Sequence, residues 1–106
     1  MSIKKLSSAR KFLKKLRANE PLSLGQLLES IRMGDEITQV EFAEKLGITR
    51  AHLCDIEKGR RIISARRAVE FAKILKYSPH QFVALALQDQ LRREGLKFKV
   101  QLEPAL

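Results

Sequence analysis

The sequence has no tryptophan, a single cysteine and three prolines, and it lacks any long apolar run. Because Cys54 stands alone, an intramolecular disulfide is excluded and nothing indicates an oxidising compartment, so we expect a cytoplasmic protein. No apolar stretch approaches the roughly 18 residues of a membrane-spanning helix, and the first residues lack the pattern of a cleaved secretion signal. We therefore expect neither export nor a membrane partner.

The sequence also lacks the patterns of a catalytic or metal-binding site. It contains no glycine-rich phosphate loop and no nucleophile at a usable spacing from a base. Two histidines, His52 and His80, with one cysteine do not make a metal site. We therefore expect no enzyme activity, no metal and no cofactor, and we interpret Cys54 as a small apolar filler rather than an oxidant sensor.

Positive charge is abundant and unevenly placed. The net charge is +9, and the first 17 residues hold seven bases and no acid, so the remaining 89 residues balance 14 bases against 12 acids. A second acid-free group comprises Lys58, Arg60, Arg61, Arg66 and Arg67. Such patches favour a polyanionic partner, because each neutralised phosphate releases counterions. For the N-terminal run, a solvated helix face is an open alternative.

A chain of 106 residues fits one compact domain with short extensions. Residues 1–20 form the first extension, a basic segment that we interpret as an amphipathic helix followed by a short linker. Its apolar stripe consists of Ile3, Leu6, Ala9, Leu13 and Leu16. We expect this helix to pack on the domain or on a partner protein; a membrane surface is the alternative.

The middle of the chain predicts two short helices joined by a tight turn. Thr38 and Glu41 have the spacing of a capping box, which opens the first helix, and Gly47 ends it. Thr49 caps the second helix, and Gly59 ends that one. The residues expected to face inward are Val40, Phe42, Ala43 and Leu46 in the first helix and Leu53 and Ile56 in the second.

Three further helices flank this pair. Serines open all of them, at Ser23, Ser64 and Ser78, and the last has a proline at its first position. The expected spans are 24–33, closed by Gly34, then 65–76, and finally 79 to about 94, closed by Gly95. The expected core residues are Leu24, Leu27, Leu28, Ile31, Ala68, Val69, Phe71, Ala72 and Leu75.

Two short helices around a glycine turn are the geometry that lays a helix into the DNA major groove. Roughly from Ser23 to Phe82, the sequence resembles the Cro and phage-repressor helix-turn-helix domains. The matching residues are Thr38, Gln39, Phe42, Ala43, Leu46, Gly47, Ile48, Thr49, Leu53, Ile56, Glu57, Gly59, Ala72 and Leu75. One departure is Ile63, where the family often has a proline. We therefore expect an all-α fold, with a five-helix domain over residues 23–94.

The resemblance implies a DNA-binding transcription regulator that reads bases with the helix over residues 49–58. Arg50 fits guanine O6 and N7, with a phosphate contact as its alternative. Ala51 fits a thymine methyl group, and His52 reaches a base or a phosphate. Asp55 either accepts from a cytosine amino group or orients Arg50 or a neighbouring base. The expected phosphate contacts are Thr38, Gln39, Thr49, Lys58, Arg60 and Arg61. For Gln39 the resemblance implies that it braces the backbone or reaches an outer base, and both threonines are helix caps first.

The resemblance also implies an ion pair between Arg32 and Glu57. In the family, residues at these two positions join the first helix of the domain to the third. A surface pair contributes under about 1 kcal/mol, so the value of this pair depends on its burial.

Residues 95–106 form the second extension. Apolar and polar side chains alternate from Leu96 to Leu102, which predicts a β-strand. Because the rest of the chain offers no partner strand, we expect this strand to pair across a dimer twofold or to join a sheet in another protein. A disordered tail is the alternative. The expected dimer contacts are Phe82, Leu85, Phe98 and Val100.

These expectations combine into a homodimeric repressor that binds double-stranded DNA at a palindromic operator. The alternative is an antitoxin, because small basic helix-turn-helix chains with an added terminal arm resemble the antitoxins of bacterial toxin and antitoxin pairs. In that case the helix of residues 1–20 or the strand of residues 95–106 binds a toxin protein, and the helix-turn-helix domain represses its own operon.

Overall fold

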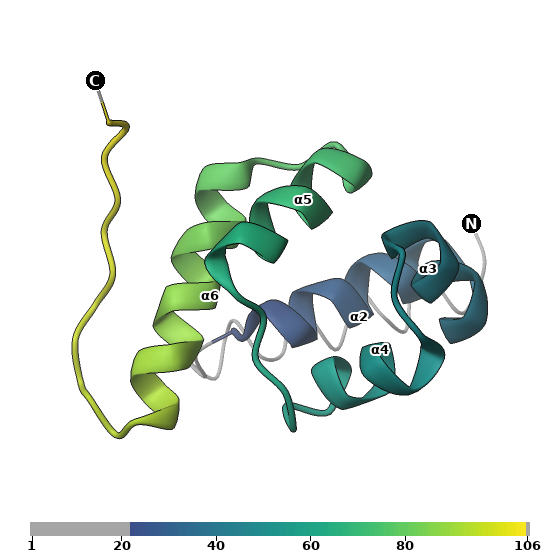
Figure 1. The fold of residues 1–106 in the computed structure, drawn as a ribbon, viewed down its shortest axis with the longest axis horizontal. Helices are drawn as coiled ribbons and strands as arrows, with labels where there is room; N and C mark the ends of the chain where they lie inside the picture. Colours follow the sequence, from purple (N-terminus) through teal and green to yellow (C-terminus); the bar gives the residue numbers. More distant parts are fainter. Residues whose placement is uncertain (1–21, 106) are drawn as a thin grey trace. The chain divides into compact units, whose positions relative to one another are not determined.

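The computed structural model describes residues 22–105, which contain five α-helices and no β-strand (Figure 1). The described residues form two compact units, which divide between residues 61 and 62. The helices are α2 (Leu24–Gly34), α3 (Gln39–Leu46) and α4 (Arg50–Glu57) in the first unit, and α5 (Ala65–Leu75) and α6 (Pro79–Arg93) in the second. The amphipathic helix predicted for residues 1–20 lies outside the described residues.

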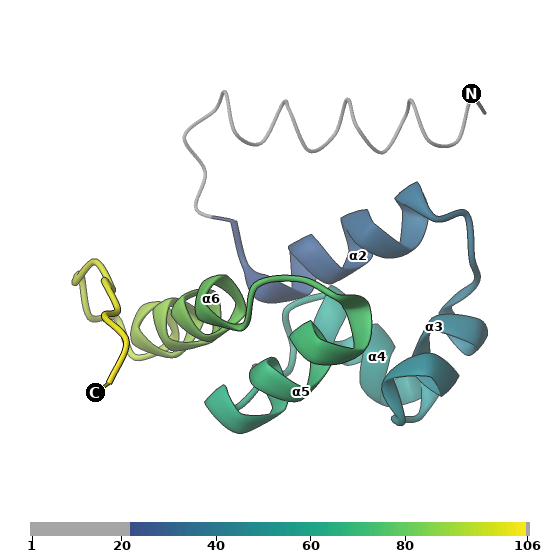
Figure 2. The ribbon, with the colours of Figure 1, turned by 90° about the horizontal axis from the view of Figure 1, so that it is seen from above.

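In the first unit, α4 packs against both α2 and α3 (Figures 1 and 2). Its buried apolar residues are Leu24, Leu28, Ile31, Phe42, Ala43, Leu46, Leu53 and Ile56. All of them were predicted to face inward. The prediction for Val40 was wrong, because this side chain is 57% exposed. At 100° per residue Val40 lies nearly opposite Phe42 on α3, so an eight-residue helix cannot bury both.

A glycine sets how closely α2 and α4 approach each other. A Cβ atom at Gly25 would lie well inside contact distance of the backbone oxygen of Ile56. Gly25 is buried within α2, where a glycine costs helix stability, so the close approach explains its presence there. This contact could not be predicted from sequence, because it depends on how two separate helices cross.

All five predicted helix starts are confirmed. In each case a serine or threonine side chain accepts a hydrogen bond from the backbone N–H three residues later. The caps are Ser23, Thr38, Thr49, Ser64 and Ser78. At Thr38 the reciprocal bond from the backbone N–H to Glu41 is also present, so the capping box is complete. These local bonds fix where each helix begins.

The helix ends confirm one prediction and correct another. Gly47 adopts the left-handed conformation (φ 75°) that turns the chain between α3 and α4. Gly34, in contrast, is the last residue of α2, and Glu36 takes the left-handed conformation (φ 58°) after it. The backbone N–H groups of Glu36 and Ile37 donate to Met33 and Arg32. This is the Schellman arrangement, here closed by a residue that carries a Cβ.

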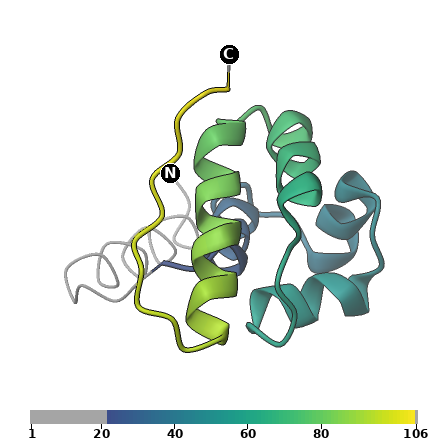
Figure 3. The same ribbon diagram turned by 60° about the vertical axis from the view of Figure 1, so that its left-hand side comes forward.

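In the second unit, α5 and α6 pack against each other (Figures 1 and 3). Its buried apolar residues are Ile63, Ala68, Phe71, Ala72, Phe82 and Ala86. The half-exposed ring of Tyr77 stacks on Phe82, with the two centroids 5.9 Å apart. Gly95 ends α6 in the left-handed conformation, as predicted, and the backbone N–H of Leu96 bonds back to Leu91.

After Gly95 the chain reverses and runs back alongside α6 as an open segment (yellow in Figures 1 and 3). The strand predicted for residues 96–102 is not formed in this single chain. The physical reason is the one that sequence already indicated: a strand requires a second strand to pair with. Hydrogen bonds from Gln88 and His80 on α6 hold the segment instead.

The four residues expected at a dimer contact differ in exposure. Phe82 is fully buried within its own chain, so its side chain is not accessible to a second copy. Leu85 and Val100 are half-buried, and Phe98 is 65% exposed. The expectation for Phe82 failed because sequence periodicity does not tell which side of an apolar helix faces its own core.

Candidate nucleic-acid interface

The outer face of α4 presents the residues expected to contact bases. Arg50 and Ala51 are exposed in the first turn, and His52 and Asp55 are partly exposed. The opposite face of α4 is buried through Leu53, Ile56 and Glu57, the last of which is its one buried charged residue. The sequence therefore builds α4 with one face fixed in the core and one face available to a ligand.

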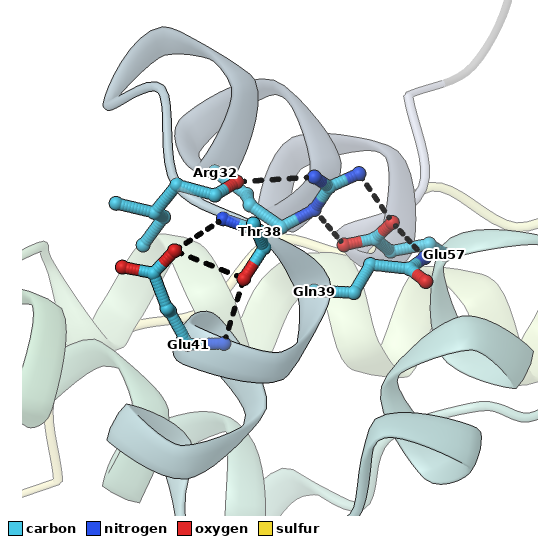
Figure 4. Close-up of polar contacts among 6 residues, drawn as sticks. Arg32, Thr38, Gln39, Glu41 and Glu57 are labelled. Carbon is cyan, nitrogen blue, oxygen red and sulfur yellow. Dashed lines mark hydrogen bonds and ion pairs between the residues drawn. The ribbon is translucent and has the colours of Figure 1, made fainter.

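A buried ion pair fixes the inner face of α4. Arg32 on α2 donates two hydrogen bonds to Glu57, from Nε to Oε2 at 2.8 Å and from Nη2 to Oε1 at 3.0 Å (Figure 4). The two side chains are only 16% and 2% exposed. The third guanidinium nitrogen, Nη1, donates to the backbone oxygen of Ile37 at 3.2 Å. The pair that the resemblance implied is thus present, and every carboxylate oxygen of Glu57 has a donor.

Gln39 joins this buried pair to α3. Its Nε2 donates to Glu57 Oε1 at 3.0 Å, so the first residue of α3 is tied to the last residue of α4 (Figure 4). We expected Gln39 to contact a phosphate. In the structure one of its two amide hydrogens is used inside the protein, which orients the side chain and leaves the second hydrogen as a donor.

A second ion pair lies on the outer side of α4. Arg60 Nε donates to Asp55 Oδ1 at 2.9 Å, with side chains that are 58% and 37% exposed. Chiefly this hydrogen bond raises the pKa of Arg60 above its usual value, and Arg60 Nη2 also lies 3.9 Å from Cys54 Sγ. We expected Asp55 to contact a base and Arg60 to contact a phosphate. The structure instead shows these two side chains bonded to each other.

The basic loop after α4 folds back over the end of the helix. The backbone N–H groups of Arg60 and Arg61 both donate to the backbone oxygen of Asp55, at 2.8 and 3.2 Å. This turn leaves the side chains of Lys58 and Arg61 exposed beside the C-terminal end of α4. Two lysine or arginine side chains in such a position supply charge to a polyanion without reading its sequence.

The two threonines expected at phosphates act first as helix caps. The Thr38 hydroxyl accepts from the N–H of Glu41 and donates to Glu41 Oε1 at 3.0 Å, so its hydrogen is used within the protein. The Thr49 hydroxyl accepts from the N–H of His52 and keeps its hydrogen as a donor. Of the two, Thr49 is therefore better suited to donate a hydrogen bond to a phosphate oxygen.

Residues 22–105 show neither a metal-binding cluster nor a membrane-spanning helix. No three His, Cys, Asp or Glu side chains in this range are grouped so that they could hold a metal ion. None of the helices there is both long and apolar enough to cross a membrane.

Comparison with protein families identifies the motif that α3 and α4 form. The family model described as helix-turn-helix matches residues 28–82, which are 55 of the 106 residues. The chain belongs to the helix-turn-helix family. This result confirms the resemblance to the Cro and phage-repressor domains. Neither the curated proteins nor the solved structures gave a significant match.

Helix-turn-helix proteins of this family are DNA-binding transcription regulators. In their arrangement the second helix of the motif enters the major groove and the first crosses the backbone. Here α3 is the first helix of the motif, the turn runs through Gly47, and α4 is the second. The exposed side chains of α4 are thus on the helix that the motif assigns to the groove.

Sequence reasoning missed two features of this helix-turn-helix. The bond from Gln39 to Glu57 was not expected, although both residues had been singled out separately. The pairing of Asp55 with Arg60 in particular was also missed, although Asp55 had been expected to orient either Arg50 or a neighbouring base. Its signal was present, because the left-handed Gly59 between them reverses the chain and brings a base five residues later back toward the acid.

Proposed function

We propose that the protein is a sequence-specific transcriptional repressor that binds a palindromic operator as a homodimer and inserts α4 into the major groove. The observation that supports this proposal is that one face of α4 is buried and the opposite face is exposed. Its inner face is fixed by the buried pair of Arg32 and Glu57, and its outer face exposes Arg50 and Ala51. Preorganised side chains on a rigid helix read bases with little entropic cost.

In this proposal the exposed side chains divide the work of binding. Arg50 donates to guanine O6 and N7, and Ala51 allows close approach of α4 to the bases. Lys58 and Arg61 bind phosphates, as do the Thr49 hydroxyl and the remaining amide hydrogen of Gln39. Asp55 keeps one carboxylate oxygen, Oδ2, for a cytosine amino group while Arg60 occupies Oδ1.

The experiment is selection of bound DNA from a random pool with the full chain, followed by affinity measurements on the selected sequence and on a scrambled one. Arg50→Ala is expected to weaken binding to the selected sequence about 10- to 100-fold and to relax preference at one position. Arg61→Ala is expected to weaken both sequences alike. Lys73→Ala, an exposed base on α5, is the control. Equal losses on both sequences for Arg50→Ala would refute the division of work.

The homodimer part of the proposal rests on the exposed apolar surface of the C-terminal segment, residues 96–105. Phe98 and Leu96 are both exposed there, and large exposed apolar side chains mark association surfaces when they cluster. A twofold dimer matches the twofold symmetry of a palindromic operator, with half-sites one or more helical turns apart. The arrangement of bases in the selected DNA tests this directly: a single unrepeated half-site would contradict it.

The same exposed segment also supports the antitoxin alternative, in which a toxin protein covers residues 96–102. The two roles make different predictions about native partners. Co-purification of the full chain from its own cells yields a small second protein if the alternative holds. It yields only the chain itself and DNA if the protein is a stand-alone repressor.

A further inference from the structure

Side chains of α6 form hydrogen bonds with the backbone of every second residue in the C-terminal segment. The Gln88 side chain donates from Nε2 to the backbone oxygen of Phe98 at 2.7 Å, and its Oε1 accepts from the backbone N–H of Val100 at 2.9 Å. His80 Nε2 lies 2.7 Å from the backbone oxygen of Leu102. All three contacts involve even-numbered residues, so one edge of the segment faces α6.

The opposite edge of the segment carries the odd-numbered residues. In an extended chain the N–H and C=O groups of alternate residues point to the same side, so residues 97, 99, 101 and 103 direct theirs away from α6. Within residues 22–105 the structure gives these backbone groups no hydrogen bond. The result is an unpaired strand edge, held in place along one helix, beside a face on which Phe98 is exposed.

We propose that this odd-numbered edge pairs antiparallel with the same edge of a second copy, in a register centred on Val100. The inference deepens the proposed function, because it rests on the homodimer and specifies its interface. In this register Lys97 lies opposite Glu103 of the second copy, and Lys99 lies opposite Gln101. On the apolar face, Phe98 lies opposite Leu102 and Val100 opposite itself. Such cross-strand pairs are the unit that stabilises a two-stranded ladder.

Charge selects this register over its neighbours. Centring the pair on Lys99 would place that lysine opposite itself, and centring it on Phe98 would place Lys97 opposite Lys99. Centring it on Gln101 would leave Lys97 opposite Ala105 and Phe98 opposite Pro104. The register on Val100 places Lys97 opposite an acid at both ends of the ladder and keeps the large apolar side chains opposite each other. The second copy is therefore complementary in charge and in apolar pattern.

The first test is a charge exchange in the full chain, read by sedimentation equilibrium. Lys97→Glu and Glu103→Lys are each expected to weaken the dimer about 3- to 30-fold, because each places like charges opposite each other twice. The double variant restores the opposite charges and should return to within about 3-fold of the parent. Lys99→Glu is the matched control in the same segment, with an expected effect smaller than either single change. Absence of restoration in the double variant would overturn the register.

The second test is a symmetric cross-link, made in a Cys54→Ala background so that no other thiol is present. Opposite residues of a non-hydrogen-bonded antiparallel pair have Cα atoms about 4.5 Å apart, which suits a disulfide. Val100→Cys is therefore expected to give a covalent dimer under mild oxidation, whereas Lys99→Cys and Gln101→Cys should give little. Efficient cross-linking of either control, or none at Val100→Cys, would overturn the proposed register.

DNA binding is measured on the same variants, so that the two proposals fail separately. A covalent Val100→Cys dimer that binds no DNA would contradict the proposed function and leave the interface standing. A chain that binds its operator as a dimer without any of these charge or cross-linking effects would overturn the interface and leave the proposed function standing.

Discussion

The two ion pairs of α4 use the same kinds of charged group in opposite surroundings. The pair of Arg32 and Glu57 lies on the inner face, joins two helices and is nearly closed to solvent. The pair of Asp55 and Arg60 lies on the outer side, joins residues five positions apart and is open to solvent. Burial strengthens a charge interaction and raises the cost of leaving either partner alone, whereas solvent screens an exposed pair.

This difference assigns the two pairs different roles. Loss of either partner in the buried pair leaves an uncompensated charge inside the domain, so the pair fixes the orientation of α4. The exposed pair contributes little to the stability of the fold, because water can replace either partner. We therefore expect changes at the inner pair to appear in stability and changes at the outer pair to appear in DNA binding.

The largest effect is expected from Glu57→Gln. This change leaves the Arg32 guanidinium buried without a counter-charge and should lower the free energy of unfolding by about 3 to 5 kcal/mol. Urea denaturation followed by circular dichroism measures it. Glu44→Gln, an exposed acid on α3, is the matched control and should have little effect. A loss below about 1 kcal/mol for Glu57→Gln would mean that the buried pair does not hold α4.

A somewhat smaller loss is expected from Gly25→Ala, which tests whether close packing supports the inner face. The new Cβ would clash with the Ile56 backbone oxygen and push α2 from α4, at a cost of about 1 to 3 kcal/mol. Gly34→Ala is the control, because a Cβ at Gly34 meets no atom within 4 Å. Urea denaturation should show Gly34→Ala at or above the parent stability; equal losses for the two variants would contradict the packing argument.

A stabilising change is expected at the end of α2, next to the buried pair. Glu36 has a left-handed backbone that a Cβ disfavours, so Glu36→Gly should raise the free energy of unfolding by about 0.5 to 1 kcal/mol. Asp35→Gly is the control, since Asp35 has an ordinary helical backbone and gains nothing from glycine. The thermal midpoint measures both variants, and a lower midpoint for Glu36→Gly would count against the assignment.

The smallest effect on stability, and a clear effect on DNA binding, is expected from Asp55→Asn. Removing the carboxylate charge weakens the contact of residue 55 with Arg60 and leaves the positive charge of Arg60 more available to a phosphate. The slope of log affinity against log salt on scrambled DNA should therefore become steeper, by the amount expected for about one additional phosphate contact. The urea midpoint should stay unchanged. Glu44→Gln serves as the control here also. An unchanged slope for Asp55→Asn would show that Arg60 does not reach the DNA backbone.

The structural features that could be predicted from sequence are mostly those that depend on residues close together in the chain. All five capping residues and the left-handed Gly47 were found, because each is fixed by hydrogen bonds within about five residues. The Arg32 and Glu57 pair came from the family resemblance rather than from spacing, since these residues are 25 positions apart.

The remaining features depend on distance through space or on a second chain. The need for Gly25 follows from how α2 and α4 cross, and the bond of Gln39 to Glu57 follows from how α3 meets α4. The burial of Phe82 follows from which face of α6 the core takes. The alternation of residues 96–102 was a real signal of extended chain, but one chain lacks the partner that a strand requires.

The most direct test of base reading by α4 is a double-mutant cycle between protein and DNA. It combines Arg50→Ala with the replacement of each guanine of the selected operator, one position at a time, by 7-deazaguanine. The substituted base lacks the N7 acceptor that Arg50 should use. At one symmetric pair of positions, the parent should lose about 10-fold in affinity, measured by fluorescence anisotropy, and Arg50→Ala should lose nothing further. Losses that add independently at every guanine would contradict the assignment of Arg50 to a base.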